Sequence, residues 1–398
     1  MSNVKAISFE TTLGEIGVFE KSYTFSRAVE GKGEVKQIHY GDIHTKLPNV
    51  INDASVLPTI TQQDDFQFVN YGDIIIADAS EDYKDLGKAV CYLDKNEKKV
   101  ISGLHTHRFN IDKDKVIPEY LINLFQTSRY QKFVWKMGTG ISVLGLSKSN
   151  LSKYPVTLPD IKTQKKIGAL FEGFNKKIQL QKEKIDLLKE QKKGYMQKIF
   201  KQKIRFKDNG GDYPSWEIKE LNRVSEINPK SPNLNDEFYY IDLESVKNGV
   251  LSKVKVVSKE DAPSRAQRVV QKDDILYQTV RPYQKNNYYV LENNSTQTVA
   301  STGYAQIRVK KGLNSIYLYQ YLQTSEFTNL VLKSCTGTSY PAINSNDLGS
   351  LTIKIPSLKE QIKIADCLSK LDEKIQLEQQ KLEDLRQQRK GFMQQMFI

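Results

Sequence analysis

Hydrophobic residues recur at alternating spacings of four and three positions in two long stretches, from Ile167 to Ile199 and from Ile364 to Met396. This average period of 3.5 residues places the side chains in one narrow stripe along a helix, and such a stripe needs a partner stripe, as in a coiled coil. The pattern therefore predicts two long helices that pair with each other within the chain. The predicted interface consists of Ile167, Phe171, Phe174, Ile178, Ile185, Leu188, Ile364, Leu368, Leu371, Ile375, Leu382 and Leu385.

Polar residues interrupt both stripes at corresponding positions, with Gln181 matched by Glu378 and Lys192 matched by Arg389. A polar residue in such a seam lowers the stability of a coiled coil but restricts the register in which its helices can pair. We therefore expect these four residues to fix the alignment of the two helices.

Capping residues mark where each helix begins. Asp160 stands at the N-cap of the first helix, and Ser357 with Glu360 forms a capping-box pattern at the start of the second. Gly194 and Gly391 lie inside the helical patterns, where each costs about 1 kcal/mol relative to alanine. Their presence in both helices indicates close approach by another helix, a helix stop, or simple fraying of the helix ends.

The two helical stretches belong to a longer repeat. At a constant offset of 197 positions, residues 151–200 match residues 348–397 at 18 of 50 positions. A period close to 200 residues indicates duplication of a whole domain and not an array of short repeats. Four further pairs of motifs correspond upstream: QTS at 126–128 and 323–325, TGIS at 139–142 and TGTS at 336–339, YGDI at 40–43 and YIDL at 240–243, and YGDIII at 71–76 and KDDILY at 272–277.

Each copy combines a globular part with a long helix. The globular parts contain short runs of strand-forming residues between Gly, Asn and Asp. A helical pair follows, in which Pro118 suits the first turn of one helix and Thr127 or Ser128 can cap the next. The predicted order is a first globular domain at 1–158, a central helical region at 159–207, a second globular domain at 208–355 and a C-terminal helical region at 356–398.

The segment after the first helix contains Asn209-Gly210-Gly211 and Pro214, which end the helix and reverse the chain. If the second domain lies at the far end of the first helix, the second helix must run back antiparallel to it. About 35 helical residues span roughly 50 Å. We therefore expect an α+β chain in which an intramolecular antiparallel coiled coil separates two similar α/β domains, as a dumbbell with pseudo-two-fold symmetry.

Composition favours a soluble, cytoplasmic protein. The 398 residues suggest more than one domain, and the chain shows neither a secretory signal pattern nor an apolar run long enough to span a membrane. Cys91, Cys335 and Cys367 have no CxxC spacing and are interpreted as reduced thiols. His105 and His107 could share a strand face and bind a metal, but we interpret them as polar surface or groove residues.

The formal net charge of +12 is concentrated in one helical region. Residues 161–207 contain 15 Lys and Arg against 4 Asp and Glu, whereas residues 358–398 contain 8 against 7. Exposed positions of a coiled coil are usually just solvated, but this excess also suits contact with phosphates or with an acidic partner surface.

A rigid spacer between two similar but non-identical domains suits a target that has two different features at a fixed separation. Duplex DNA offers such a target, since 35–50 Å corresponds to roughly 10–15 base pairs. Because the two domains differ in sequence, the two half-sites should differ as well.

Three motifs carry a resemblance to a known family. They are LPxxxxQxKI…KIQL…KGYMQKIF at Leu158–Phe200, its echo at Ile355–Phe397, and YPSWEIKEL at 213–221. With them, essentially the whole chain resembles the specificity (S) subunit of type I restriction–modification systems. The first half departs slightly from the pattern, because nothing before Thr11 matches YPSW.

The resemblance implies that the globular parts are target-recognition domains, each reading one half of a bipartite, asymmetric site in double-stranded DNA. It implies that the helical regions set the spacing and dock two methyltransferase subunits and the restriction/translocase subunits. S-adenosylmethionine, ATP and magnesium are then expected on those partners. This chain would be a non-catalytic subunit that binds no cofactor, metal or membrane.

Two other functions compete with this one. Carboxylates of a PD…ExK nuclease could be drawn from Asp160 and Glu190, but about 30 helical residues, roughly 45 Å, separate them. The second copy has Ser357 and Gln387 in their place, and the sequence contains no DPPY-like methyltransferase motif, glycine-rich S-adenosylmethionine loop or GxxxxGK[ST]. The alternative is a coiled-coil scaffold that bridges protein partners and touches DNA only incidentally.

Candidate DNA-contacting residues are basic, polar and aromatic side chains expected in loops. Arg and Lys suit guanine edges or phosphates, and Asn suits adenine. Any one of them could instead be an ordinary solvated loop residue. The candidates in the second domain are Arg265, Arg268, Arg281, Tyr283, Lys285, Asn286, Asn287, Ser339 and Tyr340. Those in the first domain are Lys36, His39, His44, Lys46 and Arg108.

Overall fold

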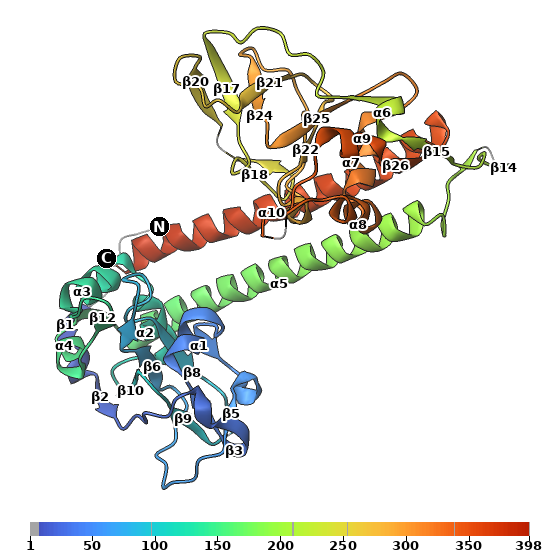
Figure 1. Cartoon of the computed structure of the whole chain (residues 1–398). Helices are drawn as coiled ribbons and strands as arrows, with labels where there is room; N and C mark the ends of the chain where they lie inside the picture. The colour runs from blue at the N-terminus through green and yellow to red at the C-terminus, as the bar shows by residue number, and fades with distance from the viewer. Residues whose placement is uncertain (1–7, 97, 209–210, 253, 338, 398) are drawn as a thin grey trace. The chain divides into compact units, whose positions relative to one another are not determined.

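The computed structural model describes residues 8–96, 98–208, 211–252, 254–337 and 339–397. The chain divides into two compact units, one from residues 1–182 and 381–398 and the other from residues 183–380 (Figure 1). The long helices are α5 (Ile161–Phe200) and α10 (Leu358–Met396), and each unit takes part of both. Among the described residues, no helix is both long enough and apolar enough to cross a membrane.

The two long helices begin next to their predicted caps. Asp160 Oδ1 accepts a backbone N–H of the first turn of α5 at 3.0 Å, and Ser357 Oγ accepts the Glu360 N–H at 3.4 Å. The prediction of the reciprocal hydrogen bond, from the Ser357 backbone N–H to the Glu360 carboxylate, is wrong. The Glu360 carboxylate instead accepts hydrogen bonds from the Arg205 guanidinium at 2.7 Å and the Trp216 indole at 3.1 Å. Glu360 therefore ties α10 to the segment that precedes the second domain.

The helices α5 and α10 pair in the antiparallel direction in both units. The neighbouring pairs are Phe171 with Phe397 and Phe174 with Phe392 in the first unit, and Lys184 with Glu378 and Lys192 with Asp372 in the second. In each unit a higher residue number on α5 meets a lower one on α10. All twelve hydrophobic residues of the expected interface are buried or half-buried. The intramolecular antiparallel pairing predicted from the 3.5-residue period is confirmed.

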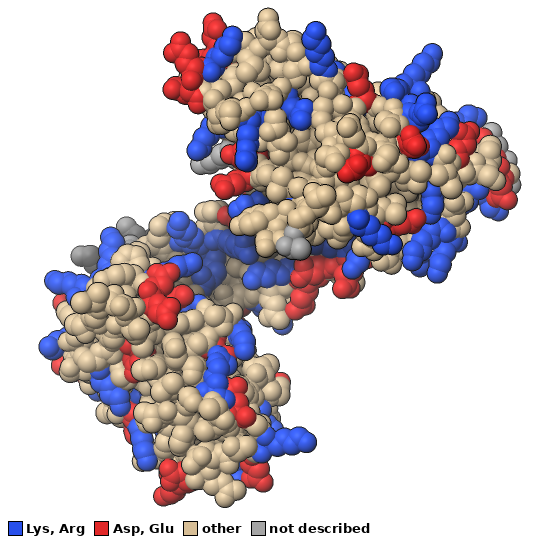
Figure 2. Space-filling view, in the orientation of Figure 1, with Lys and Arg blue, Asp and Glu red and all other residues tan. Residues whose placement is uncertain are grey.

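Lysines dominate the solvent-exposed positions of α5. They are Lys162, Lys165, Lys166, Lys176, Lys177, Lys182, Lys184, Lys189, Lys193 and Lys198. The exposed positions of α10 alternate between the two signs of charge, as at Lys374 beside Glu373. Figure 2 shows Lys and Arg side chains gathered over the middle of the long helices.

The described part of the first domain contains two main sheets and four short α-helices. The five-stranded sheet has the order β2 (Gly17–Glu20), β10 (Thr106–Ile111), β6 (Ile74–Ala77), β8 (Ala89–Tyr92) and β4 (Val50–Ile51). The three-stranded sheet has the order β5 (Thr59–Ile60), β3 (Glu30–Ile38) and β9 (Val100–Ser102). Two small pairs join β1 (Ser8–Thr12) to β12 (Pro155–Pro159) and β7 (Ala79–Ser80) to β11 (Leu144–Gly145). The helices are α1 (Tyr40–Thr45), α2 (Pro118–Leu124), α3 (Ser128–Met137) and α4 (Lys148–Ser152).

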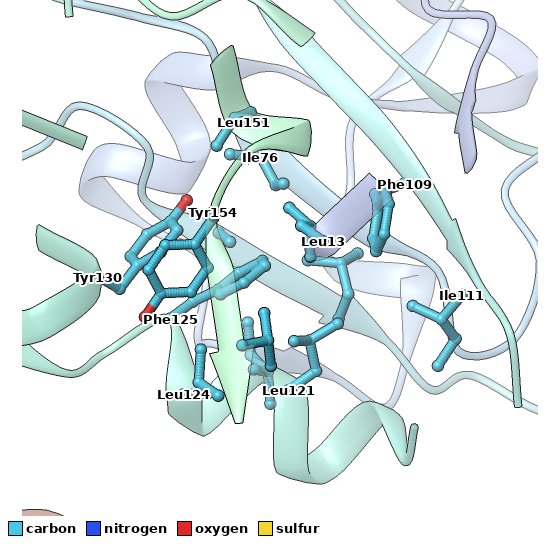
Figure 3. Packing of buried hydrophobic residues seen from close by; sticks show 14 of the residues in the cluster. Leu13, Ile76, Phe109, Ile111, Leu121, Leu124, Phe125, Tyr130, Leu151 and Tyr154 are labelled. Carbon is cyan, nitrogen blue, oxygen red and sulfur yellow. The ribbon is translucent and has the colours of Figure 1, made fainter. Parts of the chain in front are cut away.

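The core of the first domain lies where the five-stranded sheet meets α2 and α3. Ile76 and Phe109 come from the adjacent strands β6 and β10, and both are fully buried (Figure 3). The ring of Phe125 stacks on that of Tyr130 with centroids 4.4 Å apart. The Tyr130 hydroxyl donates to the Gly87 carbonyl oxygen at 3.0 Å, so this buried polar group is satisfied.

The second domain repeats this plan. One four-stranded sheet has the order β16 (Ser225–Ile227), β25 (Tyr304–Val309), β22 (Ile275–Gln278) and β23 (Tyr288–Tyr289). The other has the order β20 (Lys255–Ser258), β17 (Glu237–Ile241), β24 (Thr298–Ser301) and β21 (Ala266–Val270). Three small pairs join β15 (Glu217–Glu220) to β26 (Thr352–Ile355), β13 (Lys207–Asp208) to β14 (Gly211–Asp212), and β18 (Val246–Lys247) to β19 (Val250–Leu251). The helices are α6 (Leu221–Val224), α7 (Ser315–Leu322), α8 (Ser325–Lys333) and α9 (Ser345–Ser350).

A buried glutamine binds each long helix to a globular domain. Gln164 Oε1 accepts the Ile117 N–H at 2.9 Å, and its Nε2 donates to the carbonyl oxygens of Lys115 and Pro159. Gln361 stands 197 positions later and makes the corresponding three bonds to Asn314, Gly312 and Pro356. The helical pairs repeat as well, because Thr127 caps α3 and Thr324 caps α8.

Some correspondences near the front of each copy differ from the prediction. The match of YGDIII with KDDILY holds, since the first leads into β6 and the second into β22. The match of YGDI at 40–43 with YIDL at 240–243 is wrong, because the first lies in α1 and the second at the end of β17. Loops of different length before these elements shift the offset between the copies.

Close approach to Gly194 or Gly391 within the chain is also ruled out. A methyl group at either position would have no neighbouring atom within 4 Å in the described part of the chain. The predicted turn at Asn209-Gly210 lies outside the described residues, as do residues 1–7. The N-terminal segment can therefore be compared with the YPSW segment of the second copy only from Ser8 onward. The domain boundaries at 158, 207 and 355 stay predictions.

Candidate nucleic-acid interface

Two loops meet at the same place in both domains, and we call this place the loop junction. In the first domain it joins residues 78–80, which follow β6, to residues 139–146. In the second it joins residues 279–281, which follow β22, to the described residues 336–337 and 339–343. The bridge between Ala79 and Gly145 in the first domain corresponds to that between Val280 and Ala342 in the second.

The backbone of the loop junction is the same in both domains. In the first, Thr139 and Gly145 exchange two hydrogen bonds of 3.0 and 2.7 Å, and the Leu146 N–H donates to Asp78 O at 2.8 Å. In the second, two bonds of 2.9 and 3.0 Å and a third of 3.1 Å join the corresponding pairs, Thr336 with Ala342 and Ile343 with Thr279. The loops that follow β6 and β22 are thus held by the same backbone hydrogen bonds, and they can carry different side chains.

The loop at 279–287 of the second domain is held from inside by buried amides. Gln278 Nε2 donates to Val280 O and to Gln284 Oε1, both at 2.8 Å, and its backbone N–H donates to Asn287 Oδ1 at 2.8 Å. Asn287 is only 2% exposed. This candidate therefore supports the loop and does not point to solvent.

Lys285 and Asn286 also serve the loop. Lys285 Nζ donates to Gln323 O at 2.9 Å, and burial lowers the pKa of this amine. Asn286 Oδ1 accepts the Asn248 N–H at 3.0 Å, and its own N–H donates to Gln278 Oε1. Both side chains are half-buried, so they stabilise the loop that presents its neighbours.

Arg281, Tyr283, Ser339 and Tyr340 gather at the exposed side of the second loop junction. The Arg281 guanidinium lies over the Tyr340 ring, 4.3 Å from its centroid, and Tyr340 itself is 64% exposed. Tyr283 is 50% exposed and Ser339 is exposed. Among the described residues, the Arg281 guanidinium makes no hydrogen bond or ion pair. These four candidates are brought together and remain available to a ligand.

The other two candidate arginines of this domain differ from each other. Arg265 is exposed, whereas Arg268 is half-buried and donates from Nε to Tyr304 O at 2.9 Å. Burial lowers the pKa of Arg268. Arg268 lies beside the irregularity in the pairing of β21 with β24, so it supports the sheet edge.

Arg108 of the first domain is not a loop residue. It lies in β10, is 4% exposed, and its Nε donates to Asp73 Oδ2 at 2.6 Å. Asn110 donates to the other oxygen of Asp73 at 2.7 Å. The second domain has the corresponding arrangement, with Gln306 and Arg308 on Asp274. The expectation of an exposed Arg108 is wrong, because this buried ion pair belongs to the core of the repeat.

The remaining candidates of the first domain cluster around α1. His39 caps this helix by accepting the Gly41 N–H on Nδ1 at 3.1 Å. Burial lowers the pKa of His39 and of His44. Lys46 Nζ lies 3.4 Å from Asp42 Oδ1, and Lys36 Nζ donates to Leu57 O at 2.9 Å. Only Lys46 is fully exposed among them.

The two histidines at 105 and 107 share one acid. His105 Nδ1 lies 3.3 Å from Asp78 Oδ1, and His107 Nδ1 lies 3.6 Å from Asp78 Oδ2. Within the described residues, no group of three His, Cys, Asp or Glu side chains could hold a metal ion. The histidines therefore belong to the polar surroundings of the first loop junction, since Asp78 is part of it.

Three residues of the first loop junction were not among the candidates. Ser80 takes the place of Arg281, Val143 takes the place of Tyr340, and Ile141 is fully exposed at the tip of the same loop. The alignment of TGIS with TGTS is the signal that could find Ile141 and Val143, since Val143 falls on Tyr340 at the offset of 197; Ser80 falls on Arg281 at the offset of 201 that relates YGDIII to KDDILY.

Comparison with known proteins identifies the family. A model of the type I restriction modification DNA specificity domain matches the chain twice, over residues 9–190 and 196–387. The chain belongs to this family. The two matches confirm the predicted resemblance to type I specificity subunits and the tandem arrangement of two such domains.

Relatives of this family extend over most of the chain. The "Putative type I restriction enzyme MjaX specificity subunit" of Methanocaldococcus jannaschii is 25% identical over 346 residues, which cover 81% of this chain and 76% of the relative. The type I restriction enzyme MjaVIII specificity subunit of the same organism is 22% identical over 297 residues, or 71% of this chain and 70% of the relative.

Solved structures share the fold. A type I restriction–modification S subunit from M. genitalium superposes with a TM-score of 0.62 at 14% identity, covering all of this chain and 98% of its own. A chain from a study of complex assembly and conformational transition of the type I R-M system gives 0.58 at 16% identity, covering 98% of this chain and 97% of its own. The α+β fold class with tandem domains and a pair of long helices is thereby confirmed.

Proposed function

We propose that this specificity subunit recognises a bipartite, asymmetric site in double-stranded DNA, with one half-site read by each domain. The helix pair sets the spacer between the half-sites, and the subunit docks two methyltransferase subunits and the restriction subunits. The chain supplies recognition and no chemistry of its own. S-adenosylmethionine, ATP and magnesium act on the partner subunits.

The loop junction is the observation that carries this proposal. Its backbone hydrogen bonds are repeated in the two domains, whereas the side chains differ, with Arg281 over the exposed Tyr340 in one and the buried Ser80 with the exposed Val143 in the other. A constant frame with variable tips is suited to reading two different sequences with one fold.

The proposed fixed spacer draws support from the long helices. At 1.5 Å per residue, 40 helical residues extend about 60 Å without a break. Polar contacts in the seam, such as Lys192 with Asp372, restrict the helices to one register. A helix pair with a single register keeps a single separation between the proposed half-sites.

A non-catalytic role is consistent with the placement of the acids once weighed for a nuclease. Asp160 accepts hydrogen bonds from the backbone N–H and the hydroxyl of Thr163, so it serves as a helix cap. Incubation of the purified chain with DNA, Mg²⁺, ATP and S-adenosylmethionine should leave the DNA unchanged. Methylation or cleavage by the chain alone would contradict this part of the proposal.

The spacer can be tested by inserting seven residues after Lys182 in α5 and seven after Gln380 in α10, where the two units meet in sequence. One heptad preserves the stripe and lengthens each helix by about 10.5 Å, or roughly three base pairs. Sequencing of methylated sites in a host with the full system should show unchanged half-sites and a spacer longer by about three base pairs. Insertion in α5 alone is the control and should abolish modification. An unchanged spacer in the double insertion would refute the proposal that the helix pair sets the spacing of the half-sites.

A further inference from the structure

The Arg281 side chain differs from most arginines of this chain in having donors that no acidic partner occupies. Arg27 pairs with Asp42, Arg205 with Glu360 and Arg308 with Asp274. Among the described residues, the Arg281 guanidinium forms no hydrogen bond or ion pair and lies over the face of Tyr340. Its in-plane N–H groups therefore remain unpaired in the described structure, at a place where the backbone is tightly held.

The backbone around Arg281 is held in an uncommon conformation. Arg281 and Lys285 flank a single turn at 282–284, and both have left-handed φ angles, of 53° and 54°. Such angles are costly for residues with a side chain and persist only where surrounding bonds impose them. Here Gln278 bonds the loop from inside, and the Arg281 N–H donates to Pro341 O at 2.8 Å. The structure thus holds the Arg281 Cα in place before any ligand binds.

The Tyr340 ring orients the guanidinium. A guanidinium that stacks flat on an aromatic ring directs its N–H groups sideways, away from the ring face. Two such N–H groups match the O6 and N7 acceptors that guanine alone presents as a pair in the major groove. A side chain that is already ordered loses less conformational entropy when it binds.

We propose that Arg281 reads a guanine of the half-site recognised by the second domain, with Tyr340 as its positioning residue. This inference rests on the proposed function and goes beyond it by naming the residue and the base. The first domain has Ser80 at the corresponding position, beside Val143, so it cannot make this contact. The guanine requirement is thus specific to one half-site.

The test uses the complete modification complex with wild-type subunit, Arg281→Ala, Arg281→Lys and Tyr340→Leu, and selects bound sites from random DNA. A bidentate arginine contributes about 5- to 150-fold discrimination at its base pair. Arg281→Ala should lower the preference for guanine at one position of one half-site by that factor, with the other half-site and the spacer unchanged. Arg281→Lys retains the charge but not the fork, so it should relax the same position. Tyr340→Leu should have a smaller effect at that position.

Arg223→Ala is the matched control, because Arg223 is an exposed arginine of the same domain in α6, outside the loop junction. It should leave every position unchanged, and thermal unfolding of each variant should match the wild type. A uniform loss of affinity for all sequences in Arg281→Ala would mean a phosphate contact and would overturn the inference, as would unchanged base preferences. If the wild-type complex selects no bipartite sequence, the proposed function itself fails.

Discussion

Lys192 Nζ lies 2.6 Å from Asp372 Oδ1, and the Gln320 amide donates to the other oxygen of Asp372 at 2.8 Å. Arg389 stands 197 positions after Lys192, and its guanidinium donates to Asn175 at 3.0 Å and to Asn123 at 3.3 Å. Arg389 thus contacts both the opposite long helix and α2 directly, whereas Lys192 reaches α7 only through Asp372, which it shares with Gln320.

This relationship predicts that the Lys192–Asp372 pair contributes to stability. Lys192→Met and Asp372→Asn should each lower the free energy of unfolding, and a double-mutant cycle should give a coupling of about 0.5–1 kcal/mol. Lys193→Met, at the exposed neighbouring position, is the control and should change little. Urea unfolding of the wild type, the two single variants, the double variant and the control measures these free energies. A coupling near zero would mean that the pair has no role in the register.

The buried glutamines predict a larger effect. Gln164→Ala or Gln361→Ala leaves one backbone N–H and two carbonyl oxygens without their partners, at sites where the glutamine is at most 1% exposed. The expected cost is about 3 kcal/mol in either unit. Gln387→Ala is the control, because its exposed amide donates to the Glu383 carboxylate on the same face of α10 and fills no buried site. Chemical denaturation would show the difference, and equal values for Gln361→Ala and Gln387→Ala would contradict it.

The helices were predictable from the sequence because a 3.5-residue period needs no knowledge of the rest of the fold. Phe171 and Leu368 belong to this stripe, and both are fully buried. The roles of loop residues were not predictable in the same way. Asn287 and Arg281 have similar sequence surroundings, yet one is buried by Gln278 and the other is not. That difference depends on contacts across the folded loop.

Arg108 shows the same limit more strongly. Its burial depends on Asp73, which lies 35 positions away in the sequence and beside it only after β6 pairs with β10. The second domain has the same kind of ion pair, but its arginine stands at a different position of the strand, where Gln306 and Arg308 share Asp274. Position-by-position comparison of the two copies therefore does not reveal the conserved ion pair.

The histidines predict a pH effect confined to the first domain, which contains all four of the chain. Burial lowers the pKa of His39 and His44, so the folded state holds them neutral while the unfolded state takes up protons below about 6.5. Stability is therefore full above that pH and falls as the pH drops below it. Hydrogen exchange, corrected for its intrinsic pH dependence, should show β8 losing protection between pH 7.5 and 5.5 while β22 does not.

His44→Leu should weaken this pH dependence, because it removes one titrating group from the buried site. His105→Gln is the control, since the His105 side chain is half exposed to solvent. Equal loss of protection in β8 and β22, or greater stability of the first domain at pH 5.5, would contradict the assignment of the pH effect to the buried histidines of the first domain.

The lysines of α5 predict a salt dependence that distinguishes phosphate contact from protein docking. Lys176, Lys177, Lys189 and Lys193 are exposed, whereas Lys192 is already paired with Asp372 and is left unchanged. If the four face DNA, changing them to Gln should lower the slope of log affinity against log salt by about 0.9 for each lost phosphate contact. The base preferences should stay as they are, because phosphates carry no sequence information.

The matched control changes Lys359, Lys370, Lys374 and Lys390 of α10, which removes the same charge from the helix whose exposed face mixes both signs. A parallel drop in slope for both variants would indicate a general effect of net charge. An unchanged slope in the α5 variant excludes phosphate contact, and the excess charge would then suit an acidic partner surface. In that case the α5 variant should bind DNA normally but lose affinity for the methyltransferase subunits, which co-purification at rising salt would measure.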